Sequence, residues 1–230
     1  MRALLPRVAP LAACLLVLPA RAETVRRSVT GFKKVELRVP LDVTIRSGKE
    51  FSLALDLRDP DTADKISTEV RGDTLVISSN AHSLSLRGKN SAAITLPELR
   101  GVALSGSGNA DVSGFEGGDM DLSISGSGDI KYSGKPSTLS VAISGSGNVR
   151  LTGSCSSMSV AVSGSGNVRA ADFAAKNASV AISGSGDAEL HITGGAVQFT
   201  VNGSGDIRWT GEAATVSAVT HGSGSIQKKR

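Results

Sequence analysis

Apolar residues recur at every second position in short segments of the second half of the chain. In residues 120–124, Met120, Leu122 and Ile124 alternate with an aspartate and a serine. Alternation with a period of two predicts a β-strand with one buried face, because a helix cannot bury positions two apart on the same side. The pattern returns in Leu139-Val141-Ile143, Met158-Val160-Val162, Ala178-Val180-Ile182 and Val197-Phe199-Val201.

A second, shorter strand is predicted after each of these segments from an apolar–charged–apolar pattern. Its copies are Ile130-Lys131-Tyr132, Val149-Arg150-Leu151, Val168-Arg169-Ala170, Ala188-Glu189-Leu190 and Ile207-Arg208-Trp209. A turn of Ser-Gly or Thr-Gly follows, as in Ser133-Gly134 and Thr152-Gly153. A variable connector leads to the next copy, so one repeat comprises a strand, a glycine-rich corner, a strand, a turn and a connector.

The corner is a five-residue phrase, Ser-Gly-Ser-Gly-Asn or Asp, with two looser copies at the end. It starts at residues 105, 125, 144, 163, 183, 202 and 221, at intervals of 19 or 20 residues. Such a period is typical of repeat proteins, in which no unit can bury its apolar face alone. Stacking merges the apolar columns into one core, which predicts an all-β fold, a parallel β-helix. A run of hairpins would not need this period, and a β-propeller blade needs about forty residues.

The glycines of the phrase permit positive φ angles, and its closing Asn or Asp is expected to tolerate the left-handed region. Stacked amides in this closing column are expected to hydrogen-bond along the axis. The structural corner residues predicted in this way are Gly106, Gly108, Asn109, Gly126, Gly128, Asp129, Gly145, Gly147, Asn148, Gly164, Gly166, Asn167, Gly184, Gly186, Asp187, Gly203, Gly205 and Asp206. A calcium-binding repeat is the alternative, but the period near twenty and the frequent Asn favour a structural turn.

Residues 26–100 lack the phrase but still alternate, as in Val35-Leu37-Val39 and Leu53-Leu55-Leu57. Gly and Asp-Pro positions punctuate these segments and indicate turns. We expect residues 23–230 to form a single domain, in which 23–100 are irregular first coils with a cap and 101–230 are the regular repeats. The charges of residues 228–230 are expected to discourage edge-to-edge pairing of the last strands.

Residues 1–22 have the features of a signal peptide. Arg2 and Arg7 precede an apolar run that is too short to span a bilayer, and Ala20-Arg21-Ala22 resembles a cleavage site. A lipobox-like Leu11-Ala12-Ala13-Cys14 is the alternative, although the apolar residues after Cys14 disfavour lipid anchoring. We therefore expect export to the periplasm, the outer envelope or the medium, without a transmembrane segment after cleavage.

The charge balance does not indicate a nucleic-acid partner. The net charge is +4, and loss of three arginines with the signal peptide would bring the mature chain to about +1. Cys155 would then be the remaining cysteine, so no intramolecular disulfide could form. Aromatic residues make up 3% of the chain, which predicts a thin, aliphatic core.

The chain resembles the head GIN domain family of "putative autotransporter adhesins" over roughly residues 30–227. The resemblance is carried by Gly31-Phe32 with Val35-Glu36-Leu37, by the segments 72–77 and 95–99, and by the series of phrases that follows Leu104. It implies a right-handed β-helix in an exported bacterial protein. It implies no established activity and no catalytic residues.

Two outward columns of the repeats are candidate binding surfaces. Lys131, Arg150 and Arg169 occupy equivalent positions and would form a cationic ladder, with about 4.8 Å between coils, for an acidic glycan or lipopolysaccharide. The alternative is a solvated face with splayed side chains. The second column would form a flat docking face for another sheet or a polymer, or would simply reduce crowding; it comprises Ser123, Ala142, Ala161, Ala181 and Thr200.

No arrangement typical of catalysis is evident. His82, His191 and His221 have no periodic serine partner, and a nucleophilic serine needs a base within reach. No cofactor or metal motif is present. We therefore expect a non-enzymatic envelope or cell-surface interaction module, with adhesion as a candidate role and an envelope glycan or another envelope protein as its partner. The alternatives are a purely structural envelope scaffold and, less favoured, a polysaccharide-active β-helix enzyme.

Overall fold

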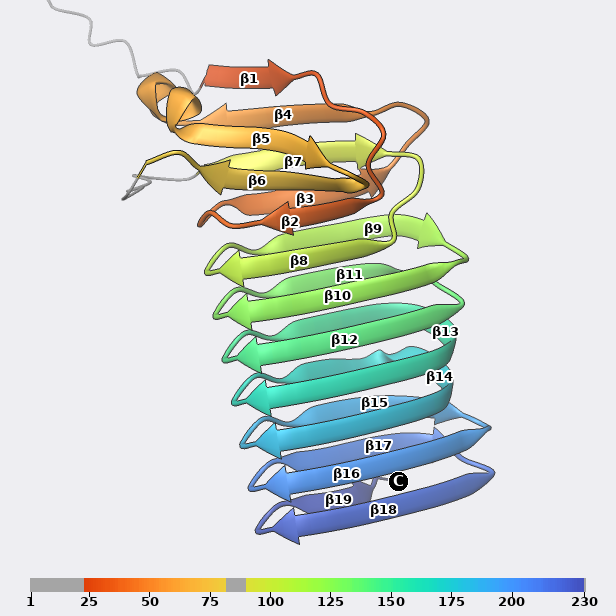
Figure 1. Ribbon diagram of the computed structural model, residues 1–230. Helices are drawn as coiled ribbons and strands as arrows, with labels where there is room; N and C mark the ends of the chain where they lie inside the picture. Colours follow the sequence, from red (N-terminus) through yellow and green to blue (C-terminus); the bar gives the residue numbers. More distant parts are fainter. Residues whose placement is uncertain (1–22, 82–89, 230) are drawn as a thin grey trace, which may run out of the picture.

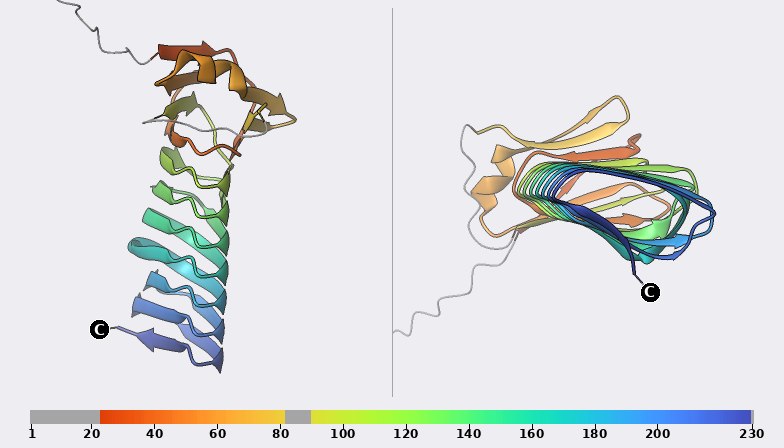
Figure 2. Two further views of the ribbon diagram at one scale, coloured as in Figure 1. Left: turned by 90° about the vertical axis from the view of Figure 1, so that its left-hand side faces the viewer. Right: turned by 90° about the horizontal axis from the view of Figure 1, so that it is seen from below.

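The computed structural model describes residues 23–81 and 90–229, which contain strands β1 to β19 and one short 3-10 helix, η1. The predicted signal peptide, the alternative lipid anchor at Cys14 and the histidine at position 82 lie outside these residues. From β8 onward the strands form two sheets that face each other across a narrow core, as the end-on view in Figure 2 shows. In the described residues, no helix is long and apolar enough to cross a membrane.

Each coil contributes one strand to a front sheet and one to a back sheet (Figure 1). The front sheet includes β8 (Gly101–Gly106), β10 (Asp119–Gly126), β12 (Thr138–Gly145), β16 (Ala196–Gly203) and β18 (Thr215–Gly222). The back sheet includes β9 (Ala110–Glu116), β11 (Ile130–Lys135), β15 (Ala188–Thr193), β17 (Asp206–Glu212) and β19 (Ser225–Lys228). In Figure 1 the nearer strands run to the left and the fainter strands to the right while the chain descends. The predicted right-handed parallel β-helix is therefore confirmed.

Equivalent strands pair in parallel at the interval of the sequence repeat. In the front sheet, Met120 pairs with Leu139, and Leu139 pairs with Met158. The inward side chains are almost fully buried and form one continuous hydrophobic cluster, in which Val160 is 2% exposed and Phe199 is 0% exposed. The predicted burial of the alternating residues is confirmed, because parallel stacking places each apolar column against its copy in the next coil.

Strands β13 (Val149–Gly164) and β14 (Val168–Gly184) run from the back sheet into the front sheet. The sequence predicted a turn and a separate connector in this region, and that prediction is wrong for these two coils. Pairing continues through the connector, where Ser154 pairs with Ala174 and Cys155 with Ala175. Gly153, with a φ of 128°, bends the chain without ending the ladder. The two connectors therefore keep their backbone pairing to each other through this bend.

The two glycines of each corner phrase serve different purposes. The first has a positive φ, which is 129° at Gly145 and 123° at Gly164, and L side chains rarely adopt this conformation. The second has an ordinary φ, but a Cβ on Gly147 would collide with the carbonyl oxygen of Gly128 in the preceding coil. The expected left-handed conformation of the closing Asn or Asp is wrong, because no described residue other than glycine has a positive φ. The first glycine supplies the positive φ of the corner, so the Asn or Asp does not need one.

The N-terminal strands do not stack in the order of the sequence. β2 (Lys34–Leu37) and β3 (Asp42–Ser47) form a coil that pairs directly with β8 and β9. The following coil, β6 (Thr74–Ser79) and β7 (Ser91–Leu96), pairs with the opposite edges of β2 and β3. The first coil, β2 and β3, therefore lies between β6–β7 and β8–β9 in the stack, and the segment from β7 to β8 runs past it (Figure 1). The backbone N–H of Arg100 donates to the carbonyl of Lys33 at 2.7 Å along this passage.

Antiparallel pairing closes the N-terminal end of the stack. β4 (Ser52–Leu57) pairs with β7, β1 (Glu23–Arg27) with β4, and β5 (Ile66–Arg71) with β6, each in the antiparallel sense. The helix η1 (Pro60–Lys65) lies beside them and begins after Asp59, whose carboxylate accepts the N–H of Asp61 at 3.2 Å. Thr62, Ala63 and Ile66 are buried here, so this end of the core is covered.

Candidate functional site

The outer surfaces of the two sheets differ in chemistry although they enclose the same core. The back sheet carries a column of mostly charged outward residues, and this surface is termed the charged face; its column runs Asp111, Lys131, Arg150, Arg169, Glu189, Arg208 and Gln227. On the front sheet, every outward residue from β12 to β16 is Ser, Ala, Thr, Asn or Gln. This second surface is termed the small-residue face.

The three cations singled out in the sequence lie side by side in adjacent coils. Lys131 pairs with Arg150, and Arg150 pairs with Arg169, in the parallel register of the back sheet. All three side chains are exposed. With neighbouring strands about 4.8 Å apart, the three positive charges form a straight row along the solenoid axis. We refer to this row as the cation ladder.

The charged residues that flank the cation ladder are paired, whereas the ladder itself is not. Arg46 Nη2 lies 3.7 Å from Asp111 Oδ1 on one side of the ladder, and Lys229 Nζ lies 3.7 Å from Glu189 Oε1 on the other. Within the described part of the chain, none of the three ladder side chains makes an ion pair or a hydrogen bond. Like charges on directly opposed strand positions repel each other. The ladder contains three positive charges with no carboxylate of the described residues within ion-pair distance, and Asp111 and Glu189 occupy the strand positions at its two ends.

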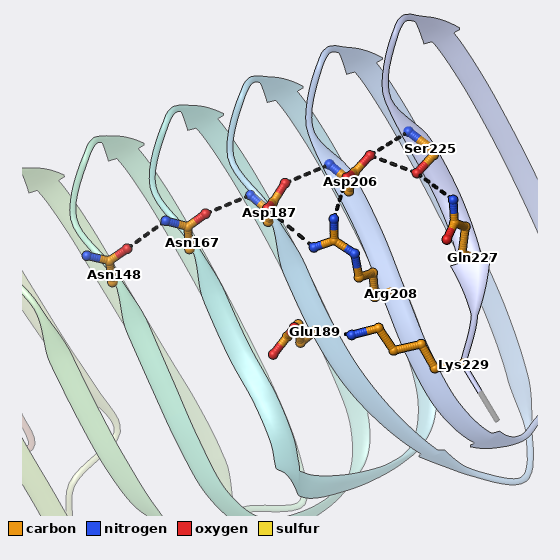
Figure 3. A network of polar contacts seen from close by, with 9 residues as sticks. All are labelled: Asn148, Asn167, Asp187, Glu189, Asp206, Arg208, Ser225, Gln227 and Lys229. Atoms are coloured by element: carbon orange, nitrogen blue, oxygen red, sulfur yellow. Dashed lines mark hydrogen bonds and ion pairs between the residues drawn. The ribbon is translucent and has the colours of Figure 1, made fainter.

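Beside the charged column, the closing Asn and Asp residues of the corners form a hydrogen-bonded ladder along the axis (Figure 3). At several steps the side-chain Oδ1 accepts the backbone N–H of the equivalent residue in the next coil. Asn167 accepts from Asp187 at 2.9 Å, and Asp187 accepts from Asp206 at 2.9 Å. The predicted amide-to-amide bonds also occur, since Asn167 Nδ2 donates to Asn148 Oδ1 at 2.9 Å. These side chains satisfy corner backbone groups, which is a structural role.

Arg208 spans two steps of this Asn/Asp ladder (Figure 3). Its Nη2 donates to Asp206 Oδ2 at 2.6 Å, and its Nη1 lies 3.5 Å from Asp187 Oδ2. Hydrogen bonds from Ser225 lower the pKa of Asp206, and the charge of Arg208 acts in the same direction. The guanidinium thus compensates the step at which two aspartates stack directly. Sequence analysis placed Arg208 in the charged column but missed this contact, which the aspartate two residues earlier could have indicated.

Among the residues that the structure describes, the remaining reactive side chains do not form a catalytic arrangement. Burial raises the pKa of Cys155 to about 11, so its thiol is protonated at neutral pH and is a poor nucleophile. Tyr132 lies buried nearby, and burial raises the pKa of its hydroxyl. His191 Nδ1 lies 3.1 Å from Thr210 Oγ1, and His221 is exposed in the last coil. Across residues 23–81 and 90–229, no group of three or more His, Cys, Asp or Glu side chains could hold a metal ion.

The column of small residues on the front sheet is also in register. Ser123 pairs with Ala142, Ala142 with Ala161, and Ala161 with Ala181, and Thr200 continues the column. A shallow hollow in the front sheet is lined by Ser123, Ala142, Ala161 and Ala181 together with the outward serines of the neighbouring column. The backbone here is covered by no long side chain, so a flat partner could approach it closely.

Residues 31–213 match a family described as "putative auto-transporter adhesin, head GIN domain". No curated protein matches the sequence.

Solved structures of similar fold come from other bacteria. A putative adhesin from Bacteroides fragilis is 24% identical, with a TM-score of 0.85 over 92% of this chain and 99% of that one. A putative lipid binding protein from Parabacteroides distasonis is 22% identical, with a TM-score of 0.71 over 91% and 97% of the two chains. A putative adhesin from Parabacteroides merdae is 19% identical, with a TM-score of 0.70 over 91% and 97%. At these identities the likeness shows the fold alone.

Proposed function

The chain belongs to the family described as "putative auto-transporter adhesin, head GIN domain", and we propose that it is a non-enzymatic interaction module of the cell envelope that binds an anionic polymer on its charged face. The observation that carries this proposal is the cation ladder of Lys131, Arg150 and Arg169, which is in register, exposed and unpaired. The family's adhesin description agrees with an exported protein, as the predicted signal peptide does.

An axial polyanion is the ligand that best suits the cation ladder. Three stacked cations repel one another unless they splay apart or meet an anion. A polymer with a carboxylate or phosphate on successive units, lying along the solenoid axis, would contact all three cations at once. Acidic glycans and the phosphorylated core of lipopolysaccharide have this chemistry. Each exposed charge pair contributes little by itself, so the proposal depends on several contacts acting together.

The distribution of aromatic residues favours recognition by charge over recognition by stacking. All seven aromatic residues, five Phe with one Tyr and one Trp, lie in the described part of the chain, and none of them is exposed. Neutral sugars would therefore find no aromatic platform on this surface. Binding should be strongly salt-dependent, because dissolved ions screen the attraction between exposed charges, with a Debye length of about 10 Å at an ionic strength of 0.1 M.

The test compares the variant K131Q/R150Q/R169Q with the matched control K33Q/R71Q/R100Q. Both variants replace one lysine and two arginines, but the control residues are exposed and already paired, with Glu98, Glu69 and again Glu98. Binding to immobilised polygalacturonate and to lipopolysaccharide vesicles is measured by surface plasmon resonance at low and high salt. At about 0.2–1 kcal/mol per exposed pair, loss of three pairs should lower the affinity of the ladder variant roughly 3- to 150-fold.

The control variant should bind like the unmodified protein. Equal loss in both variants would mean that net charge, and not the cation ladder, determines binding. No binding of the unmodified protein to either probe would favour a purely structural envelope scaffold instead.

Docking of another flat surface on the small-residue face is a second candidate function. It is favoured by the absence of any charged or long side chain among the outward residues of β12 to β16, apart from a single glutamine, Gln198. Replacing Ala142 and Ala161 with bulky residues should abolish capture of an envelope partner while leaving polyanion binding intact. Unchanged capture by this variant would contradict the docking role.

An adhesive role additionally requires display on the cell surface. Fractionation of a tagged protein, combined with protease treatment of intact cells, measures where the protein resides. Cleavage of the tag in intact cells is expected for an adhesin. A protein that is protected in intact cells and released with the periplasm could still bind envelope polymers but could not bind other cells.

A further inference from the structure

Among residues 23–81 and 90–229, nothing covers the C-terminal end of the solenoid. β18 and β19 each pair on one side only, with β16 and β17 respectively, and they form the last strands of the two sheets (Figure 1). All eight residues of β18 are exposed. Val216 and Val219, at 51% and 45%, are the large hydrophobic residues found exposed in the described part of the chain. Exposed apolar surface thus coincides with a free hydrogen-bonding edge.

The core columns continue to this open end without cover. Val216 and Ala218 are in register with Val197 and Phe199, which point into the core and are 3% and 0% exposed. The difference in burial arises because Val197 and Phe199 have a coil on both sides, whereas the residues of β18 have one on a single side. The opposite end of the solenoid shows how this fold is closed, since β1, β4, β5 and η1 cover the core there.

The devices that usually protect a free edge are missing from β18. It contains no proline and no Asp, Glu, Lys or Arg. The C-terminal lysines, which were expected to discourage pairing at the edge, make their ion pairs with earlier coils. Lys228 Nζ donates to Glu212 Oε1 at 2.9 Å and lies 5.2 Å from the centre of the Trp209 ring. Lys229 reaches back to Glu189 (Figure 3). Both lysines are held against earlier coils.

We propose that two copies of this chain join end to end through their C-terminal coils, with β18 of one copy pairing antiparallel with β18 of the other. A second copy is the occupant that fits because the open end presents two strand edges, β18 and β19, separated by the thickness of the core. A single strand could cover only one of them, whereas an identical end offers two edges at the same separation. A two-fold axis makes such pairing self-complementary.

The register and the charge of β18 are both compatible with this contact. Pairing centred on Ala218 places Val216 opposite Thr220 of the second copy, and Ser217 opposite Val219 of the second copy. Inward residues then meet inward residues, as the pleat requires. No like charges on β18 oppose each other, because β18 has none of the four charged residue types.

The predicted dimer is of moderate affinity. The two edges supply eight residues from β18 and four from β19 per copy, fewer than the roughly 20–30 residues per side of a standard interface. We therefore expect dissociation in the micromolar range or weaker, and a monomer–dimer equilibrium that depends on concentration.

Analytical ultracentrifugation of the purified chain over about 1–500 μM tests the proposal, a range that brackets micromolar dissociation constants. The unmodified protein should dimerise, and small-angle X-ray scattering should show a maximum dimension close to twice that of the monomer. V219K should be monomeric, because a cation then lies in the contact. T200K is the matched control: Thr200 lies in the same outward column on β16, which is paired on both sides, so this variant should still dimerise.

Circular dichroism checks that V219K and T200K remain folded. If V219K does not fold, V216K provides a second variant with a cation on the free edge. A protein that is monomeric throughout this range would overturn the proposal. So would dimers that persist in V219K and V216K, or a dimer whose maximum dimension indicates side-by-side packing.

Discussion

The front and back sheets of this solenoid share a core, a coil spacing and their corners, yet their outer surfaces have opposite chemistry. The back sheet carries charged side chains at one outward position per coil, and the small-residue face of the front sheet carries none from β12 to β16. The inward positions are apolar in both sheets because the core demands it. Only the outward columns are free of the requirement to be apolar. Residues in these columns can therefore change the binding properties without changing the fold.

The largest expected effect concerns the corners, which both faces share. G166A should destabilise the protein by about 3 kcal/mol, because the new Cβ would meet the carbonyl oxygen of Gly147 and the side chain of Ile143. The matched control is S146A, at an exposed corner position, which should change the free energy of unfolding by less than about 0.5 kcal/mol. Urea denaturation measures both. Similar values for the two variants would show that the corner stack is looser than described.

A new negative charge should have a measurable effect on the charged face and little effect on the small-residue face. R150E places a carboxylate between Lys131 and Arg169, so it should raise the free energy of unfolding by about 0.5 kcal/mol through relief of repulsion. The same change should lower polyanion affinity by about tenfold or more, since one favourable contact becomes unfavourable.

The control for that experiment is A161E, at an exposed position in the part of β13 that lies in the front sheet. It has no cationic column around it and should neither stabilise the fold nor change polyanion binding at high salt. If R150E were destabilising while polyanion binding persisted, the cation ladder would be a solvated surface without a ligand.

The charged face should also be the more sensitive of the two to acid. The folded-state pKa of Asp206 is lowered by Ser225 and Arg208, so its ionised form stabilises the fold above the unfolded-state pKa, which is near 3.9. This contribution is lost as the pH falls through the lower, folded-state value. The last coils should therefore exchange their amide hydrogens faster as the pH falls below about 4.

D206N separates this effect from general acid unfolding. The amide keeps an oxygen acceptor for Ser225 but does not titrate in this range. Its β17–β19 amides should lose less protection between neutral and acidic pH than those of the unmodified protein, by hydrogen-exchange mass spectrometry corrected for intrinsic rates. Identical losses would remove Asp206 from the explanation.

The smallest effect is expected on the small-residue face. A161T adds a β-branched residue at an exposed strand position, which should change the free energy of unfolding by no more than about 0.5 kcal/mol. Thermal denaturation of A161T and G166A would compare the smallest and the largest expected loss of stability at two positions only a few residues apart. A large loss in A161T would mean that this face is packed against something in the folded protein.

Much of the regular part could be predicted because its physics is local. Alternation with a period of two assigns Val160 to the core and Ala161 to the surface, and the interval of 19 or 20 residues aligns Lys131 with Arg150. The role of the second glycine of each corner could not be predicted in this way. Gly147 is required by the close approach of another coil, and the distance between two coils is not visible in one stretch of sequence.

The candidate site was predicted in its register but not in its electrostatics. Sequence alignment of the repeats placed Lys131, Arg150, Arg169 and Arg208 in one column as equivalent residues. In the folded protein Arg208 is bonded to Asp206 and lies near Asp187, while the other three have no partner in the described chain. The distinction depends on side-chain rotamers and on which acids neighbouring coils supply, and identical columns do not reveal it.

The sequence by itself determined the parallel β-helix, its period, its buried columns and the residues that face outward, because these follow from hydrophobic alternation repeated at a constant interval. Only the tertiary structure decided that the first coil, β2 and β3, lies between β6–β7 and β8–β9, and that Lys228 and Lys229 fold back and leave β18 unguarded. The physical reason is the same in both cases. Every strand edge offers the same backbone donors and acceptors, so which edges meet, and which stay free, depends on contacts between distant segments.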